Sequence, residues 1–286
     1  MIDAEMRNVS YTYSRGTPFE AVAVNNVTVS FEKGKITGVI GHTGSGKSTI
    51  SQLLGGLLPA TEGEVIICGE NISRDRKHAR GTNFKVGVVF QYPEYQLFDE
   101  TVYKDIAFGP ANMGLSEEET GRRVADAAMH VGLDKSLLSK SPFELSGGEK
   151  RRAAIAGVLA ICPEILILDE PAAGLDPRGR EEILRQIVNY RDKTGACIIM
   201  ISHSMEDIAE YCDNILVMNK SRVFMYGTVG EVFSRAEELS EIGLGVPQVT
   251  KVLAELKKLG YDVNTSAFTV EDAVREIIRA GGGKKC

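Results

Sequence analysis

The chain has 286 residues, of which 43% are hydrophobic and 25% are charged, and its formal net charge is −6. These values are ordinary for a globular protein with room for one large domain and a smaller one. The acidic balance argues against a general nucleic-acid binder, which usually carries a basic face, so no nucleic acid is expected as a partner. Apolar stretches fall far short of the roughly 20 residues that a membrane-spanning helix needs, so membrane association is expected to require a partner.

The cysteines and the N-terminus both bear on cellular location. The five cysteines are scattered and odd in number, and Asp3 and Glu5 stand where a signal peptide would have a basic segment. Both features predict a reduced, cytosolic protein whose thiols are mostly buried.

The first thirty residues alternate in the manner of strands and predict an antiparallel β layer. Val9, Tyr11 and Tyr13 share one face of the first predicted strand. The tyrosines are explained by half-buried packing, and the alternative is that one of them stacks on a purine, because base stacking accepts a flat apolar partner.

A glycine-rich loop follows the apolar run from Ile36 to Ile40. It reads Gly41-His42-Thr43-Gly44-Ser45-Gly46-Lys47-Ser48 and leads into a predicted helix from Thr49. The pattern G-x-x-x-x-G-K-[ST] between a strand and a helix is typical of a phosphate-binding loop. Its amides can surround phosphate oxygens, while Lys47 reaches the terminal phosphates and the Ser48 hydroxyl binds Mg²⁺. A glycine-rich turn without a ligand is the alternative, which the flanking strand and helix disfavour.

Polar residues also end three other predicted buried strands, and open α/β sheets bind ligands at such carboxyl ends. These residues are Gln91 after Lys85 to Phe90, Asp169 and Glu170 after Ile165 to Leu168, and His203 after Ala196 to Ile201. Asp169 suits the shell of a metal ion, and Glu170 is placed to polarise water as a general base. Hydrogen bonding at a strand or helix end explains Gln91 and His203 taken singly. Beside Lys47 and Glu170, a catalytic contact by His203 is favoured.

Residues 99–160 have a helical character and predict a separate subdomain. Within it, Leu145-Ser146-Gly147-Gly148-Glu149 opens a helix whose one face is formed by Ile155, Val158, Leu159 and Cys162. Two glycines weaken a helix start unless bare amides are needed there. With the Ser146 hydroxyl they predict a second anion-binding site, and a tight turn into the helix is the structural alternative.

The core is expected to end near Phe233, after strands at 215–218 and 222–226. Residues 234–286 predict a helical C-terminal extension with a disordered tail from Gly281. One of its helices places Val249, Val252, Leu253 and Leu256 on one face. Helices this short bury little by themselves, so their apolar faces need the core or another subunit.

Residues from about 2 to 233 resemble the ATP-binding cassette (ABC) family, because these motifs occur in the family's order and spacing. The resemblance implies an α/β fold with the parallel core sheet of phosphate-loop NTPases, an antiparallel β layer and a helical signature subdomain. It implies ATP and Mg²⁺ as cofactors and ATP hydrolysis as the activity. The domains are then 1–233 for the ATPase and 234–286 for a dimerisation extension.

The same resemblance assigns roles to individual residues. Tyr13 stacks on adenine, residues 41–49 cradle the phosphates, Ser48, Gln91 and Asp169 surround Mg²⁺, and Lys47, Glu170 and His203 support hydrolysis. Ser146, Gly147, Gly148, Glu149 and Asp176 contact ATP held by a second protomer. Each site is therefore expected to be complete only in a head-to-tail dimer.

A narrower resemblance, to the ATPase subunits of energy-coupling factor (ECF) transporters, lies in five segments and in the phosphate loop. The segments are 90–98, 105–110, 141–144, 156–159 and 202–207, and His42-Thr43-Gly44 is similar to the second (A-prime) ATPase type. It implies pairing with a homologous ECF ATPase, or a homodimer in isolation. It also implies a transmembrane coupling subunit, a substrate-binding membrane subunit, and uptake of vitamins or transition-metal ions at the cytoplasmic face of the membrane.

Two departures and three alternatives accompany this interpretation. Glu149 stands where glutamine is commoner in the family, and Ala172-Ala173 replaces Thr-Ala, although neither removes a phosphate ligand or the base. A conventional ABC importer ATPase is the nearest alternative. A DNA-repair or chromosome ATPase would carry coiled-coil insertions or a basic surface, and a small-molecule kinase would not explain Leu145 to Glu149 together with His203.

Overall fold

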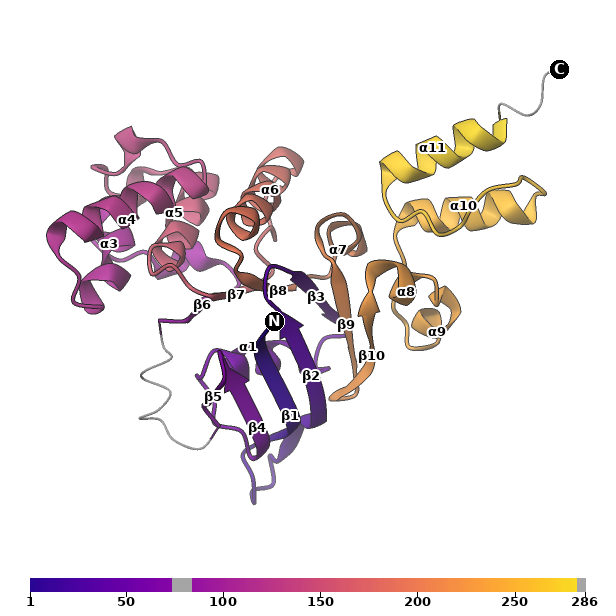
Figure 1. Ribbon diagram of the computed structural model, residues 1–286, viewed down its shortest axis with the longest axis horizontal. Coiled ribbons are helices and arrows are strands. Elements are labelled where there is room, and N and C mark those ends of the chain that lie inside the picture. Colours follow the sequence, from indigo (N-terminus) through magenta and orange to yellow (C-terminus); the bar gives the residue numbers. More distant parts are fainter. Residues whose placement is uncertain (74–83, 282–286) are drawn as a thin grey trace.

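The computed structural model describes residues 1–73 and 84–281, which form two β-sheets with helices around them (Figure 1). The surface excursion predicted over residues 71–83 and the disordered tail predicted from Gly281 fall largely outside the described residues.

The first sheet is the predicted antiparallel layer, with strand order β2-β1-β4-β5. Its apolar face includes Met6, Val27 and Phe31, which are buried against α1 and the second sheet. The strands are β1 (Ile2–Tyr13), β2 (Ala21–Glu32), β4 (Glu62–Ile67) and β5 (Glu70–Asn71). The position of α1 (Lys47–Leu54) between the two sheets fixes the start of that helix, which is also the end of the phosphate loop.

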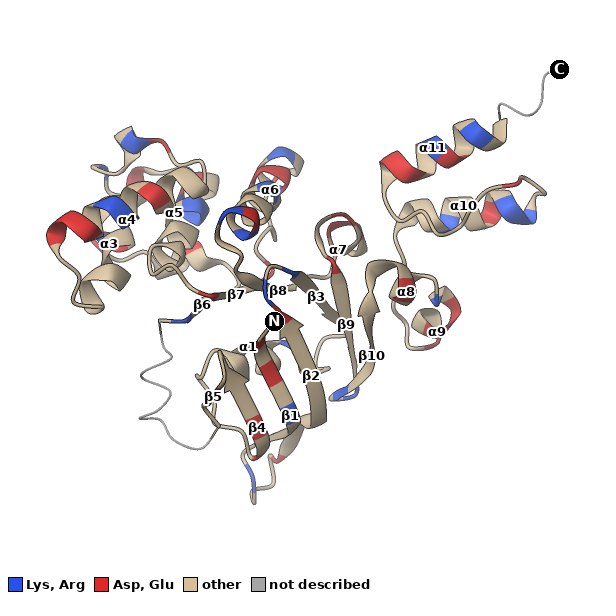
Figure 2. Ribbon diagram, in the orientation of Figure 1, with Lys and Arg blue, Asp and Glu red and all other residues tan. Residues whose placement is uncertain are grey.

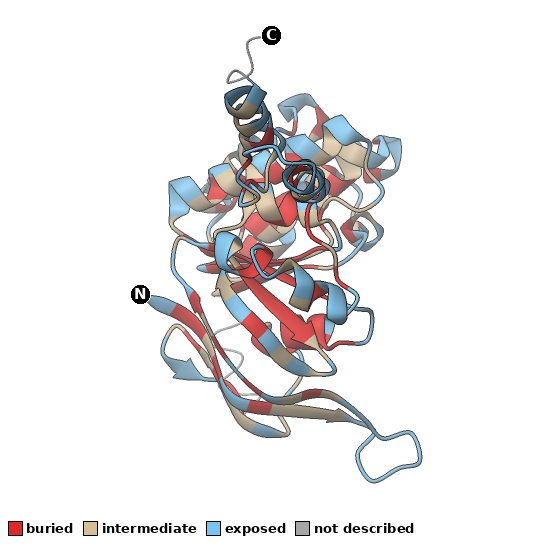
Figure 3. Cartoon of the chain, turned by 90° about the vertical axis from the view of Figure 1, so that its right-hand side faces the viewer, coloured by how far each residue is buried: buried red, intermediate tan, exposed pale blue. Residues whose placement is uncertain are grey.

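The second sheet has six strands in the order β10-β9-β3-β8-β7-β6, and every pair except β9–β10 is parallel. Continuous apolar runs such as 165–168 are fully buried, as expected where a parallel sheet is covered on both faces (Figure 3). The strands are β3 (Ile36–Gly41), β6 (Val86–Val89), β7 (Ile165–Asp169), β8 (Cys197–Ile201), β9 (Asn214–Asn219) and β10 (Arg222–Thr228). The parallel order brings the carboxyl ends of β3, β6, β7 and β8 to one edge.

Three helices form a group to one side of the parallel sheet, within the predicted helical segment (Figure 1). They are α3 (Val102–Asn112), α4 (Glu117–His130) and α5 (Gly147–Leu159). Helix α6 (Pro177–Thr194) packs against α4, and α7 (Met205–Tyr211) packs against α6 (Figure 1). The ring of Tyr190 on α6 meets the His130 ring edge-on at 5.5 Å, and its hydroxyl donates to the Pro163 carbonyl. These contacts fix the helical group against the sheet.

Two predictions about cysteines were wrong. Helix α5 ends at Leu159, and Cys162 lies beyond it as an exposed residue with a positive φ of 54°. Of the cysteines in the described part of the chain, Cys197 alone is buried. Pro163 explains the early end, because the residue before a proline is disfavoured in a helix.

The C-terminal part contains four helices in two groups. They are α8 (Val229–Phe233), α9 (Ala236–Glu241), α10 (Gln248–Lys258) and α11 (Val270–Gly281). Leu239, Leu244 and Val246 belong to the main apolar core, whereas Leu253 and Ala273 belong to a separate small cluster. We therefore propose that the independent C-terminal unit begins close to α10, later than residue 234.

Side-chain exposure corrects one assignment in that unit. Val252, predicted on the buried face of α10, is 53% exposed, whereas Leu253 is fully buried. Helix α11 buries Ala273 and leaves Val274, Ile277 and Ile278 exposed. The apolar surface of this unit that is expected to require a partner thus lies mainly on α11. Within residues 1–73 and 84–281, no helix has both the length and the apolar character needed to span a membrane.

Candidate functional site

A cleft of about 450 Å³ opens at the shared carboxyl edge of the parallel strands. It brings together side chains from the first strand, the phosphate loop and three other strand ends. The lining residues are Tyr13, Ala23, Thr43, Gly44, Gly46, Lys47, Ser48, Thr49, Gln91, Asp169, Glu170, Ile201 and His203. Most of the residues predicted to act on one triphosphate therefore share one cavity, although Gly41, His42 and Ser45 of the phosphate loop are not among its lining residues.

The phosphate loop has the backbone geometry of an anion cradle. Gly46, the residue before α1, has a φ of 105°, and a Cβ atom there would lie 2.3 Å from the Ala23 carbonyl oxygen. Only glycine fits this position, so the loop's shape depends on it. Lys47 is buried, and its Nζ donates to the carbonyl oxygens of Gly41 (2.7 Å) and His42 (2.9 Å). Burial lowers the pKa of Lys47, so its ammonium group gains from an added anion.

Side-chain oxygen atoms that could bind a metal ion lie next to the start of α1. Burial raises the pKa of Asp169, while a hydrogen bond with Ser48 and the nearby Lys47 ammonium partly oppose that rise. Ser48 and Asp169 share the cleft with the Gln91 amide. Hydroxyl, carboxylate and amide oxygens suit Mg²⁺, which also keeps waters and takes ligands from substrate phosphates. Within the described part of the chain, no group of three or more His, Cys, Asp or Glu side chains is arranged to hold a metal ion.

Glu170 has the most perturbed carboxylate of the cleft. Burial raises its pKa to about 7, assisted by the adjacent Asp169 and opposed by Lys47. Its Oε1 atom is buried without a hydrogen-bond partner, and Nε2 of His203 lies 3.6 Å from it. Its φ of 52° is rare for a residue with a side chain, and such strained backbone clusters at functional sites. A carboxyl group with a pKa near neutrality is suited to take a proton from water.

Of the two N-terminal tyrosines, Tyr13 lines the cleft, whereas Tyr11 packs against the antiparallel layer. The Tyr13 hydroxyl lies 3.3 Å from Oγ1 of Thr49 and donates to Gln52 at 3.3 Å. Its ring is 38% exposed at the rim of the cleft, next to the start of α1. This position leaves ring surface available to a planar group bound in the cleft.

A second cleft, of about 550 Å³, contains the other predicted anion site. It joins the start of α5 to the turn before α6 and shares no lining residue with the first cleft. Its lining residues include Ser146, Gly147, Gly148 and Asp176. Glu149 is not among them, because its Oε2 accepts hydrogen bonds from the Ser146 amide (2.8 Å) and hydroxyl (2.7 Å) in a capping box. The Glu149 charge is thus turned back onto its own helix start.

Arg151 is a residue of this region that sequence reasoning missed. It is 2% exposed and forms a bidentate ion pair with Glu94, in which Nη2 donates to Oε1 at 2.7 Å and Nε donates to Oε2 at 3.0 Å. It also donates to the carbonyl oxygens of Pro171 and Ala173. One side chain therefore connects the segment after Gln91, helix α5 and the loop after Glu170. The sequence carries no spacing signal for a contact between residues so far apart.

His42 was predicted among the nucleotide-binding residues, but its side chain does not line the first cleft. Its Nε2 atom lies instead 2.5 Å from the carbonyl oxygen of Ile242 in the C-terminal part.

A phosphate loop, an acidic strand end and a strand-end histidine around one cleft, on a mixed β-layer and parallel-sheet scaffold, define an ATPase of the cassette class. A family model described as "ABC transporter" matches residues 24–173. The energy-coupling factor transporter ATP-binding protein EcfA2 of Caldanaerobacter subterraneus subsp. tengcongensis is 51% identical over 98% of this chain and 98% of its own length. The protein of the same name from Clostridium perfringens is 50% identical over 96% of this chain and 98% of its own length.

Solved structures agree with these relatives. cbiO1 of Clostridium perfringens, described as part of the ABC transporter complex cbiONQ, has a TM-score of 0.76 and 35% identity over 90% of this chain and 99% of its own. The cassette MJ0796, solved as a dimer bound to ADP and Pi, has a TM-score of 0.71 and 26% identity over 79% of this chain and 98% of its own. The chain belongs to the ABC transporter family, and within it to the ATP-binding proteins of energy-coupling factor transporters. The predictions of fold class, family and ATPase function are confirmed.

Proposed function

We propose that the chain binds ATP in the cleft around Lys47 and hydrolyses it with Glu170 as the general base, as the ATPase subunit of an energy-coupling factor transporter. The observation that carries the proposal is the position of Glu170. Its carboxylate shares one cavity with the phosphate loop, carries no hydrogen bond on Oε1, and has a pKa raised to about 7. This arrangement matches a base for water near neutral pH.

The nucleotide is expected to lie with its phosphates against the amides of residues 41–49 and its adenine against Tyr13. On binding, Lys47 exchanges the carbonyl oxygens of its own loop for phosphate oxygens, a stronger charge-assisted pairing. Ser48, Gln91 and Asp169 would hold Mg²⁺, which when bound neutralises charge on the phosphates. His203 lies beside Glu170 and is placed to contact the γ-phosphate.

Hydrolysis in this proposal requires a second ATPase subunit. The start of α5 lines a different cleft from the one around Lys47, and the two clefts share no lining residue. In a head-to-tail pair, the amides of Gly147 and Gly148 would face the partner's nucleotide, with Asp176 at the junction. The partner would be a homologous ECF ATPase, or a second copy of this chain in isolation. The exposed apolar side chains of α11 would add to that contact.

An aromatic surface next to the cleft favours a membrane partner. Tyr95 is 84% exposed, Phe98 61% and Phe108 51%, and the last two rings meet edge-on at 5.1 Å. Clustered exposed aromatic rings are typical of protein-protein contacts. This surface is continuous with the segment after Gln91, so a transmembrane coupling subunit docked here would act directly on the site. We place the chain on the cytoplasmic face of the membrane, with vitamins or transition-metal ions as the solutes that a substrate-binding membrane subunit selects.

Affinity purification of the tagged chain from its native membranes tests the proposal. Recovery of a second ATPase with an integral membrane coupling protein, and magnesium-dependent ATP hydrolysis by the recovered complex, are the expected results. Recovery with a permease that depends on a soluble solute-binding protein would instead identify a conventional importer ATPase. Absence of nucleotide binding by the purified full chain would overturn the assignment of the cleft.

A further inference from the structure

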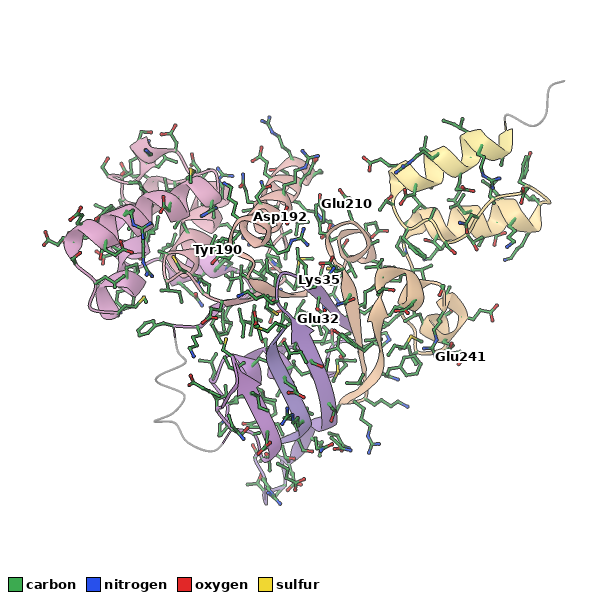
Figure 4. The ribbon with its side chains drawn as sticks, in the orientation of Figure 1. Glu32, Lys35, Tyr190, Asp192, Glu210 and Glu241 are labelled. Carbon is green, nitrogen blue, oxygen red and sulfur yellow. The ribbon has the colours of Figure 1, made fainter. Side chains whose placement is uncertain are left out.

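The side chain of His42 ties the phosphate loop to the C-terminal part of the chain. Its Nε2 atom lies 2.5 Å from the Ile242 carbonyl oxygen, 200 residues later in the sequence. Because a carbonyl oxygen only accepts, Nε2 must carry the hydrogen and donate it. The acceptor follows directly after Glu241, the labelled end of α9 in Figure 4. A hollow of about 370 Å³ separates the loop from the following linker and from α10.

The linker is held in place rather than loosely attached. Gly243 has a φ of 74°, its amide donates to the Ser240 carbonyl (2.9 Å), and the Leu244 amide donates to the Leu239 carbonyl (2.8 Å). This pair of bonds is a Schellman turn that ends α9 and leaves the Ile242 carbonyl to another donor. Leu239 and Leu244 are buried in the main core. The acceptor of the His42 bond therefore occupies a fixed position.

A second bond attaches α10 beside the same site. Oε1 of Glu206 accepts from the Gln248 amide, at 3.2 Å, where α10 begins. Glu206 lies in the first turn of α7, close behind His203. An acid at a helix N-terminus is favourable for that helix, so the bond also stabilises the start of α10. The C-terminal helices thus contact the core next to His203, which lines the nucleotide cleft, and next to His42 of the phosphate loop.

The backbone of His42 belongs to the phosphate cradle itself. Its carbonyl oxygen accepts from Nζ of Lys47 (2.9 Å) and from the Ser45 amide (3.1 Å). A shift of His42 toward or away from Ile242 would move the partner of Lys47 and the hydrogen bond that closes the loop. One residue accordingly joins the phosphate loop to the α9–α10 linker.

We propose that His42 is a positioning residue that preorganises the phosphate loop by anchoring it to the α9–α10 linker, so that loss of this contact weakens nucleotide binding. The proposal rests on the nucleotide site proposed above. Anchoring a loop in its bound shape strengthens binding because less order is lost when the ligand arrives. The anchor predicts an effect on affinity and KM rather than on the chemical step.

The contact can be broken from either side in the full-length chain. His42→Ala removes the donor, and Gly243→Ala places a Cβ atom 3.0 Å from His42 Nε2, which displaces the imidazole. Each variant should weaken ADP binding by about twofold to tenfold, the range expected for one hydrogen bond. The KM for ATP should rise similarly with little change in kcat. The double variant should be no weaker than the weaker single variant, because both remove the same contact.

Two further variants separate this effect from general damage. His42→Gln restores a donor and should bind ADP within about twofold of the wild type, given the modest value of one hydrogen bond. Gly260→Ala adds the same left-handed strain in the same C-terminal unit, at a φ of 90° with no atom within 4 Å, and should leave affinity unchanged. Thermal unfolding of each variant shows that it is folded.

The outcomes distinguish this inference from the proposed function. Wild-type protein that fails to bind ADP would overturn the nucleotide site. Wild-type binding with folded His42→Ala unchanged in affinity, or effects of His42→Ala and Gly243→Ala that simply add, would overturn the anchoring role alone. If Gly243→Ala does not fold, the comparison of His42→Ala with His42→Gln decides the matter, since equal loss in both would also reject it.

Discussion

Nε2 of His203 lies 3.6 Å from the unpartnered Oε1 of Glu170, across the end of two neighbouring parallel strands. Burial and the Lys47 charge lower the pKa of His203, while burial raises that of Glu170 to about 7. Oε1 of Glu170 therefore keeps its hydrogen-bonding capacity for a molecule bound in the cleft beside the pair.

Replacing Glu170 with glutamine should separate binding from hydrolysis. The amide preserves shape but cannot accept a proton, so Glu170→Gln should keep ATP affinity and lose roughly 10²-fold or more in turnover. ATP binding and single-turnover hydrolysis measure the two effects, and a stable ATP-bound dimer should accumulate. Turnover close to that of the wild type would show that the base is another group.

The same substitution should alter stability in a pH-dependent way when nucleotide and magnesium are absent. The pKa of Glu170 in the folded state, about 7, exceeds the value of 4.5 for a solvent-exposed glutamate, so the folded state binds the extra proton. Its stabilising effect is complete below about pH 4.5 and is lost as the pH rises through 7. With some solvent screening, Glu170→Gln should be more stable than the wild type by about 1–3 kcal/mol at pH 8 and nearly equal at pH 5. Urea unfolding at both values measures this difference.

The matched control is Glu62→Gln, which replaces an exposed carboxylate on the antiparallel layer. It controls for the loss of one carboxylate charge at an exposed position. A pH-independent difference for Glu170→Gln would contradict the raised pKa.

Arg151 should be far more important for stability than an exposed arginine with a similar ion pair. Arg151→Ala leaves the Glu94 carboxylate and two carbonyl oxygens without their donor, which should cost about 3–5 kcal/mol of unfolding free energy. Arg178→Ala breaks an ion pair with Glu182 in which the arginine is 89% exposed, and should change little. Denaturant titration compares them.

A double variant identifies the source of the loss. Glu94→Gln in the Arg151→Ala background removes the stranded charge and should recover part of the stability. If Arg151→Ala alone leaves the free energy of unfolding nearly unchanged, the contacts of this side chain with Glu94, Pro171 and Ala173 do not stabilise the fold.

The apolar face of α11 should contribute to pairing with another ATPase but not to folding. Ile278 is 69% exposed, so Ile278→Asp should leave the unfolding midpoint unchanged. Its charge would be buried in an apolar contact, so dimer affinity should fall at least tenfold, on the order of the cost of an unpaired buried charge. Analytical ultracentrifugation with ATP measures the affinity, and Leu57→Asp, at a 53% exposed position outside the C-terminal part, is the control. Equal weakening by both variants would remove α11 from the interface.

The sequence was most informative where local pattern and fold agree. The run 165–168 is apolar throughout and the run 36–40 is mostly apolar, because both faces of the parallel sheet are covered, so strands could be predicted there. Polar residues at their ends could be placed on one edge because parallel strands share direction. Lys47, Glu170 and His203 were predicted in this way to act on the same ligand, whereas the role of Tyr13 followed only from the family resemblance.

Contacts that depend on packing between distant segments could not be predicted. The Arg151–Glu94 pair and the His42–Ile242 bond join residues 57 and 200 positions apart. Rotation of α10 about its axis, which exposes Val252, is set by what the helix packs against and not by its apolar spacing. Charge offers no guide either, since Figure 2 shows acidic and basic residues interspersed along α4, α6, α10 and α11.

The separation of the two clefts has a consequence for how this chain's sequence should be interpreted genetically. In the proposed pair, a substitution at Lys47 impairs the use of ATP bound to this chain, whereas a substitution at Ser146 or Glu149 impairs the use of ATP bound to its partner. With a non-identical partner, the two sites of the complex are chemically unlike, and each chain carries part of the other's phenotype. A defect at Ser146 or Glu149 of this chain should therefore not be rescued by a wild-type nucleotide cleft in either chain. The substitution lies in one gene product, whereas the nucleotide that it affects is bound by the other.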